Sequence, residues 1–395
     1  MLYNISRSKI SFKMKKLSAK LILSLFTISA GLSARATTRT VNNTTLPVNP
    51  GQYSTVGAAI GASSAGDTII VAGSASPYDY SAITLDRPLV LLGAGYNPQG
   101  ANRYATKTLQ GFQFTCGASG STIMGFEFDN LVFTIAGGGT TYNNITFARN
   151  YFNYNNNIAL NFTNSDSCNN INIINNIFGN RSTIDINPPW FNHSFIYNNV
   201  FLSDGSNTTA FIFIYNSSYS TLIVDHNLFL CGSNSIPLLT GFALNNSFGF
   251  IEPTFVCLLS NNIFYNCTPY YFDFTAPLCY NNISYAGDIV HTMTGSGNLN
   301  NTDPMLASIF NNPTLLFDFN SDNIGLKSGS PAINAGSDGT NMGPTGGLYP
   351  VYNTNLNYLT GEPPVPEVTQ ITVTGSTTVT PGGTVNVTVK AIKIN

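Results

Sequence analysis

Charged residues are scarce in this chain. Only 9% of its 395 residues are Asp, Glu, Lys or Arg, whereas 43% are hydrophobic. This balance excludes a disordered chain and leaves solubility to the many Asn, Ser and Thr side chains. Beyond residue 36, no stretch reaches the roughly 18 uninterrupted apolar residues that a membrane-spanning helix needs.

The amino-terminal 36 residues have the three parts of an export signal. Lys13, Lys15, Lys16 and Lys20 precede the apolar stretch 21–32, and Ala34-Arg35-Ala36 has the small-x-small pattern of a cleavage site. We therefore expect cleavage after Ala36 and a secreted, extracellular or surface-attached protein with no transmembrane segment. The alternative is an uncleaved membrane anchor, and Met14 offers a second start that would leave out residues 1–13.

Basic residues become rarer still after this segment. Seven of the sixteen Lys and Arg residues precede position 37 and none of the eighteen Asp and Glu residues does. Residues 37–395 thus hold nine basic and eighteen acidic groups, a formal net charge of nine minus eighteen, or −9. Nucleic acid is therefore not an expected partner, since its binding requires cationic side chains on phosphates.

Metal-binding motifs are also missing, because the chain has neither a CxxC pair nor a Cys/His cluster. We expect no cofactor; Ca²⁺ is compatible with the fold but is not indicated, and turn-capping roles are preferred for Asp67 and Asp338. An exported protein can oxidise its cysteines, but their spacing selects no pairing. We prefer a role as small core residues for the six cysteines: Cys116, Cys168, Cys231, Cys257, Cys267 and Cys279.

What the chain does contain is a repeat of two apolar residues two apart, then Asn, then Phe. One copy reads Ile171-x-Ile173-x-x-Asn176-x-Phe178, and successive Asn residues lie about 20 to 35 residues apart, which is the spacing of a solenoid. The repeated asparagines are Asn150, Asn176, Asn199, Asn227 and Asn262. Tyr280-Asn281-Asn282-Ile283 resembles a degenerate last copy.

Each repeated asparagine is expected to have two roles. Coils stacked about 4.8 Å apart allow a ladder of side-chain amide hydrogen bonds. Asn also tolerates the left-handed conformation that a sharp turn requires. We therefore predict a left-handed backbone at Asn176, so that its replacement by Gly costs less than replacement by Ala.

Leucine-rich repeats share part of this pattern, but the segments between copies favour a different solenoid. They contain extended runs rich in β-branched and aromatic residues, at 158–162, 183–186 and 210–214. Several strands per coil predict an all-β fold: a right-handed parallel β-helix with an amino-terminal cap helix and a short carboxy-terminal β-hairpin tail.

Both ends of the predicted solenoid are similar to a known family. Tyr53-Ser-Thr-Val-Gly-Ala-Ala-Ile60, Ser64-Ala-Gly-Asp-Thr-Ile-Ile-Val71 and Pro88-Leu-Val-Leu-Leu-Gly-Ala-Gly95 resemble the entry of secreted right-handed β-helix proteins of the pectin-lyase-like superfamily. Gly325-Leu-Lys-Ser-Gly-Ser-Pro-Ala-Ile-Asn-Ala-Gly336 resembles their exit. The resemblance implies the fold and a cap helix, but not one activity, since the family includes lyases, hydrolases and surface proteins.

These patterns divide the chain into four parts. We predict a signal peptide at 1–36, the β-helix at 37–347, a Pro-rich linker at 348–366 and a β tail at 367–395. Alternation at Val385, Val387 and Val389 and the turn residues Pro381-Gly382-Gly383 indicate a hairpin in the tail.

Catalytic candidates are few. Elimination from a uronate needs a base and a cation, and hydrolysis on this fold needs two carboxylates. Residues 130–285 contain only Arg149 and Arg181 as basic groups and no Asp-Asp pair. Asp225 and His226 form the best polar pair, and Arg149 occupies the place of His226 three coils earlier, about 15 Å away. All three stay weak candidates, since the preferred explanation of the pair is a solvated Asp beside a His that replaces one ladder Asn.

The outward positions of the repeated strand include apolar residues, among them Phe195 and Tyr197. Such a face is either covered by a loop or forms a contact surface. Trp190, in Pro188-Pro189-Trp190-Phe191, either presents its ring to a sugar or lies under its own loop. Phe195, Tyr197 and Trp190 are therefore our candidate ligand-binding residues.

Three functions stay open at this stage. An exported or cell-surface β-helix that binds a polysaccharide or surface glycan without cleaving it is preferred. A polysaccharide lyase or glycoside hydrolase is the alternative, and a structural or adhesive stalk is the third.

Overall fold

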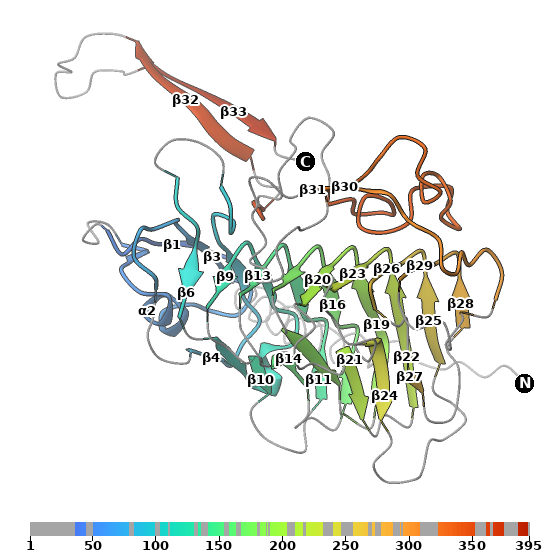
Figure 1. Ribbon diagram of the computed structural model, residues 1–395. Coiled ribbons are helices and arrows are strands. Elements are labelled where there is room, and N and C mark those ends of the chain that lie inside the picture. Colours follow the sequence, from blue (N-terminus) through green and yellow to red (C-terminus); the bar gives the residue numbers. More distant parts are fainter. Residues whose placement is uncertain are drawn as a thin grey trace, which may run out of the picture. The chain divides into compact units, whose positions relative to one another are not determined.

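A computed structural model of the chain (Figure 1) describes residues 36–44, 50–78, 83–98, 103–109, 111–129, 133–135, 141–153, 158–162, 167–179, 182–186, 188, 190–203, 210–215, 219–231, 240–245, 256–267, 271–272, 278–286, 293, 295–308, 323–351, 361–363, 366–374 and 386–393. The predicted export signal lies outside these residues except for Ala36.

Three long parallel sheets make up the β-helix, and the chain visits them in turn, so that each coil adds one rung (Figure 1). Sheet A runs in the order β2 (Gln52–Tyr53), β1 (Thr38–Val41), β3 (Thr68–Val71), β5 (Val90–Leu92), β8 (Thr122–Met124), β12 (Thr146–Ala148), β16 (Asn172–Ile174), β19 (Trp190–Tyr197), β22 (Tyr219–Asp225), β25 (Val256–Ser260) and β28 (Leu278–Tyr280), with β11 (Thr141–Asn143) and β15 (Ser167–Asn169) beside it.

The other two sheets follow the same axis. Sheet B contains β29 (Ile283–Tyr285), β26 (Ile263–Tyr265), β23 (Leu228–Cys231), β20 (Val200–Ser203), β17 (Ile177–Phe178), β13 (Tyr151–Phe152), β9 (Glu127–Phe128) and β6 (Lys107–Thr108). Sheet C contains β27 (Tyr271–Phe272), β24 (Thr240–Asn245), β21 (Ala210–Tyr215), β18 (Thr183–Ile186), β14 (Ile158–Asn161), β10 (Phe133–Ile135), β7 (Phe112–Phe114) and β4 (Ile83–Leu85). The parallel β-helix expected from the repeat is therefore confirmed.

The repeat residues fill the inside of the coil. Ile173, Ile196 and Val224 occupy one inward register of sheet A and are fully buried. The repeated phenylalanines stack from coil to coil on sheet B, with ring centroids 4.8 Å apart for Phe152–Phe178 and 4.6 Å for Phe178–Phe201. Side chains of the same type on successive rungs thus stack into continuous columns inside the hydrophobic core.

The repeated asparagines form a hydrogen-bonded ladder between sheets A and B. The side-chain Nδ2 of Asn176 donates to Oδ1 of Asn199 at 3.0 Å and to the carbonyl of Phe147 at 2.9 Å. Its own Oδ1 accepts from the backbone N–H and Nδ2 of Asn150. The same contacts join Asn199, Asn227, Asn262, Asn282 and Asn298, so that the ladder extends past the five asparagines of the clear repeats.

The left-handed residue is not the ladder asparagine, so this part of our prediction is wrong. A positive φ occurs one residue earlier, at a set that we call the left-handed column: Arg149, Asn175, Asn198, His226, Asn261 and Asn281. The chain turns before the ladder residue because its side chain must point inward to reach two coils. For the same reason, His226 replaces a left-handed Asn and not a ladder Asn.

Both ends of the solenoid carry additional elements. Helix α2 (Val56–Gly61) contacts β1 to β4 and buries Val56, Ala59 and Ile60, and the Thr55 hydroxyl accepts from the N–H of Ala58 as its cap. After the last coil, β30 (Leu306–Ser308) pairs with β31 (Asn323–Leu326). The tail forms the antiparallel pair β32 (Pro366–Thr374) and β33 (Asn386–Lys393), and the expected Pro381-Gly382-Gly383 turn lies outside the described residues.

All six cysteines are free thiols. Cys116, in the short 3₁₀ helix Cys116–Ala118, is exposed, whereas the other five are buried in the core. Burial raises the pKa of the Cys279 thiol to about 12. These five side chains therefore pack as small apolar residues.

Candidate functional site

The residues that follow the last coil return along the β-helix and lie on the left-handed column. We call residues 336–351 the strap. The strap contacts Asn261 at two points, because Ser337 N–H donates to its Oδ1 at 2.7 Å and Gly343 N–H donates to its backbone carbonyl at 2.7 Å. Thr340 contacts His226 and Gly346 contacts Asn198, so the strap extends from later coils to earlier ones.

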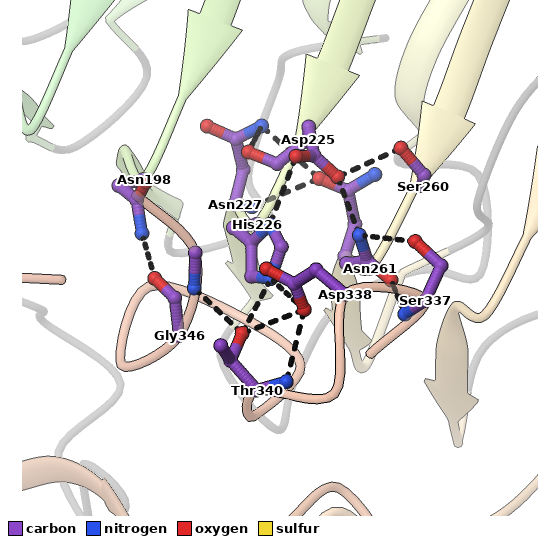
Figure 2. A network of polar contacts seen from close by, with 12 residues as sticks. Asn198, Asp225, His226, Asn227, Ser260, Asn261, Ser337, Asp338, Thr340 and Gly346 are labelled. Atoms are coloured by element: carbon purple, nitrogen blue, oxygen red, sulfur yellow. Dashed lines mark hydrogen bonds and ion pairs between the residues drawn. The ribbon is translucent and has the colours of Figure 1, made fainter. Parts of the chain in front are cut away.

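Asp225 and His226 lie directly under the strap (Figure 2). The Asp225 carboxylate Oδ2 is 2.9 Å from His226 Nδ1, and its Oδ1 accepts from the Ser260 hydroxyl and from Asn261 Nδ2. His226 is only 1% exposed. Both carboxylate oxygens of Asp225 thus have partners within the protein.

The other ring nitrogen of His226 faces the strap (Figure 2). Nε2 is 3.2 Å from the Thr340 hydroxyl oxygen and 3.6 Å from Asp338 Oδ1. The same hydroxyl oxygen accepts from Gly347 N–H at 2.7 Å and lies 2.8 Å from Asp338 Oδ1. Burial opposes ionisation of Asp338, but the hydrogen bonds from Thr340 and the nearby His226 keep its pKa below the usual value.

A carboxylate, an imidazole and a hydroxyl in a row are also the parts of an activated nucleophile. Here the polar positions around the Thr340 oxygen are filled by Gly347 and Asp338, and the strap covers the imidazole. The Gly347 backbone, at φ +75°, lies so close to the ring that an added Cβ would come within 3.0 Å of it. We therefore assign these side chains to fastening the strap.

Arg149, the third catalytic candidate, has a comparable role on an earlier coil. Its Nη1 donates to the carbonyl of Glu362 at 2.7 Å, and burial lowers its pKa. Glu362 is 9% exposed and also bridges to Arg103 at 3.3 Å. Residues 361–363, within the segment expected to be a linker, therefore lie against the β-helix, while the predicted domain boundaries stay predictions.

The structure keeps the candidate catalytic residues apart. Asp225 and His226 are adjacent, whereas Arg149 lies three rungs away in the same column, as the register through Ala148, Ile174, Tyr197 and Asp225 shows. His193 is an exposed residue at φ +49°, and His291 lies outside the described residues. Asp67 accepts from Ser64 N–H and pairs with Arg39 at 3.2 Å, while Asp338 caps the turn at Thr340.

The candidate ligand-binding aromatics lie on β19. Phe195 and Tyr197 face outward, are partly exposed, and stack with centroids 5.5 Å apart and planes 10° from parallel. Burial raises the pKa of Tyr197 to about 12, with smaller contributions from Asp225 and Tyr349. At neutral pH its hydroxyl is therefore an uncharged donor.

Trp190 begins the same strand but belongs to a different surface. It is 44% exposed and is the first residue of β19, so it does not lie under its own loop. A left-handed bend at His193 separates it from Phe195, and its segment pairs with β15 while Phe195 and Tyr197 pair with β16. The structure thus brings together two of the three aromatics.

Sequence reasoning placed Ile223 and Leu258 on the same outward face as this aromatic pair, but it missed Leu278 and the residues of the strap. Ile223, Leu258 and Leu278 continue the outward register of Phe195 on the next three strands, and Leu278 is 51% exposed. From the strap, Leu348 and Tyr349 are 83% and 49% exposed. The strap residues carry no periodic signal, because their neighbours are distant in sequence.

Among the described residues, no group of three His, Cys, Asp or Glu side chains is arranged to hold a metal ion. In the same part of the chain, no helix is long and apolar enough to cross a membrane.

The chain matches no model of a known protein family, and no curated protein sequence matches it either.

Proposed function

We propose that this is an exported or cell-surface protein that binds a neutral or weakly charged glycan, without cleaving it, through the outward face of β19. The observation that carries the proposal is the stacked, partly exposed pair Phe195 and Tyr197. Rigid aromatic rings with one polar hydroxyl offer a flat apolar surface and a hydrogen bond, which is the combination that a sugar ring needs.

Charge supports a neutral ligand. Residues 37–395 have a formal net charge of −9 by the count above. An anionic uronate polymer would be repelled by such a surface unless Ca²⁺ bridged the two. Binding without cleavage is favoured because Asp225, His226 and Arg149 all engage internal partners.

Glycan arrays and calorimetry on the mature protein test this proposal. Phe195→Ala and Tyr197→Ala should each weaken binding about tenfold or more, as expected for loss of an aromatic anchor. Their melting temperatures should change little, since neither ring belongs to the core. Tyr104→Ala is the matched control, because Tyr104 is exposed but lies elsewhere.

The enzyme alternative has one supporting observation, the row of Asp225, His226 and Thr340. Incubation with pectate, alginate and neutral polysaccharides, with and without Ca²⁺, would detect new unsaturated or reducing ends. Appearance of such ends, and their loss in His226→Ala or Arg149→Ala, would overturn the non-catalytic proposal. Absence of any bound glycan would favour the structural stalk.

A further inference from the structure

The strap ends in a closed loop. Val351 N–H donates to the Pro344 carbonyl at 2.8 Å, which ties residues 344 and 351 together. Asn198 Nδ2 donates to the same carbonyl at 3.2 Å and to the Gly346 carbonyl at 2.7 Å (Figure 2). The loop 344–351 is therefore pinned to the β-helix at its base, while Leu348 and Tyr349 between the pinned ends are exposed.

The pinning residue also fixes where the loop lies. Asn198 directly follows Tyr197, so the loop base is one residue from the stacked rings. Tyr349 is close enough to Tyr197 to contribute to its raised pKa, after burial and Asp225. The exposed Leu348 and Tyr349 thus belong to a loop whose base adjoins a ring pair that is itself partly exposed.

A second fastening acts from the other side of the loop. Thr340 holds Gly347 N–H at 2.7 Å, and Thr340 in turn contacts His226. Gly347 favours this close approach to the imidazole, because an added Cβ would lie 3.0 Å from the ring and φ is +75°. The base of the loop is therefore tied to Asn198 directly and its middle to His226 through Thr340, so the backbone that carries Leu348 and Tyr349 is attached at two points.

We propose that Leu348 and Tyr349 form a second wall of the glycan site, and that Asn198, His226 and Thr340 are positioning residues that hold this wall beside Phe195 and Tyr197. This inference rests on the proposed function, because the wall has meaning only if the rings bind a ligand. It commits to the same occupant: a neutral glycan chain lying between the β19 rings and the strap loop. The loop would thereby set which glycans fit, while the β19 rings supply the stacking surface.

The test measures binding and strap order separately. Neutral hexasaccharides of glucose, mannose, xylose and galactose serve as probes in calorimetry, and amide hydrogen exchange reports on residues 340–351. Tyr349→Ala should lower affinity about tenfold with unchanged strap exchange. Thr340→Val should lower affinity by a similar factor, and the Gly347 and Val351 amides should exchange at least tenfold faster. Thr302→Val is the matched control and should change neither quantity, because the Thr302 hydroxyl donates to the nearby Asn300 carbonyl and not to the strap.

The possible outcomes separate the two proposals. If Phe195→Ala weakens binding while Tyr349→Ala and Leu348→Ala do not, the wall is overturned and the proposed function stands. If Thr340→Val accelerates strap exchange without weakening binding, the positioning role is overturned. If the unaltered protein binds none of the probes nor any glycan on an array, the proposed function fails and the wall with it.

Discussion

Two columns of residues run side by side along this β-helix, one position apart in the sequence, and they differ in how they vary. The ladder column is asparagine on every coil from Asn150 to Asn282, and its members are fully buried. The left-handed column changes from Arg149 to Asn198 to His226. Each ladder residue has an equivalent asparagine on the coil before and after it, so one side chain serves throughout. In the left-handed column, Arg149, Asn198 and His226 each meet a different part of the returning chain.

This difference shows how a repeat can mislead. A residue that breaks a repeat is easily taken for a catalytic one, as with Arg149 and His226. In the structure both break the pattern because the strap and residues 361–363 reach them. Variation within a solenoid column therefore marks contact with non-repeating chain as well as function.

The largest expected effect comes from breaking the ladder. Asn176→Ala removes an amide that uses all its hydrogen-bonding groups, and leaves the Phe147 carbonyl and the Asn150 amide without a partner in a buried site. Since each unsatisfied buried group costs about 1 to 3 kcal/mol, the free energy of unfolding should fall by more than about 3 kcal/mol. Denaturant titration measures the loss.

The same position tests the corrected turn. Because Asn176 is not left-handed, Asn176→Gly should be no better than Asn176→Ala. A clear advantage of Gly would restore the left-handed assignment that the structure overturns.

Asp185 sharpens the comparison, because it is buried like the ladder asparagines but its Oδ1 has no hydrogen-bond partner. Burial raises its pKa to about 6, above the value of 3.8 expected in the unfolded chain. The folded state therefore binds the Asp185 proton more tightly than the unfolded chain does. The resulting stabilisation of the folded state is complete below about pH 4 and is lost as the pH rises through about 6. Asp185→Asn should abolish this pH dependence and raise stability at pH 7 by on the order of 2 kcal/mol.

Melting curves at pH 4, 5, 6 and 7 for both proteins check the sign. A wild-type protein that becomes more stable between pH 4 and 6, relative to Asp185→Asn, would contradict it. Such a result would mean that Asp185 gains a partner in solution.

The smallest effect is expected in the left-handed column itself. Asn175→Ala should cost about 1 to 2 kcal/mol from left-handed strain, whereas Asn175→Gly should be nearly neutral because its side-chain Oδ1 has no partner to lose. Chemical denaturation of the two variants measures the difference. Equal losses would show that the side chain, and not the backbone, matters at this position.

The sequence by itself predicted the parallel β-helix. The apolar pair at period two indicates a short strand, and the repeated Asn-x-Phe indicates side chains that contact their equivalents on the next coil. Ile173, Asn176 and Phe178 are placed by contacts that recur at every repeat. Even so, the sequence could not tell which of two adjacent asparagines takes the left-handed turn. Both tolerate that conformation, and only the ladder geometry distinguishes them.

The tertiary structure alone decided what surrounds the candidate site. Asn198 meets Gly346, His226 meets Thr340 and Arg149 meets Glu362 across 114 to 213 residues of chain. These contacts are made once each, so they leave no period in the sequence. A sequence repeat reflects interactions between equivalent residues on neighbouring coils, whereas the position of the strap depends on the path of the whole chain. For that reason the fold could be predicted from the sequence, but the roles of Arg149, His226 and Tyr349 could not.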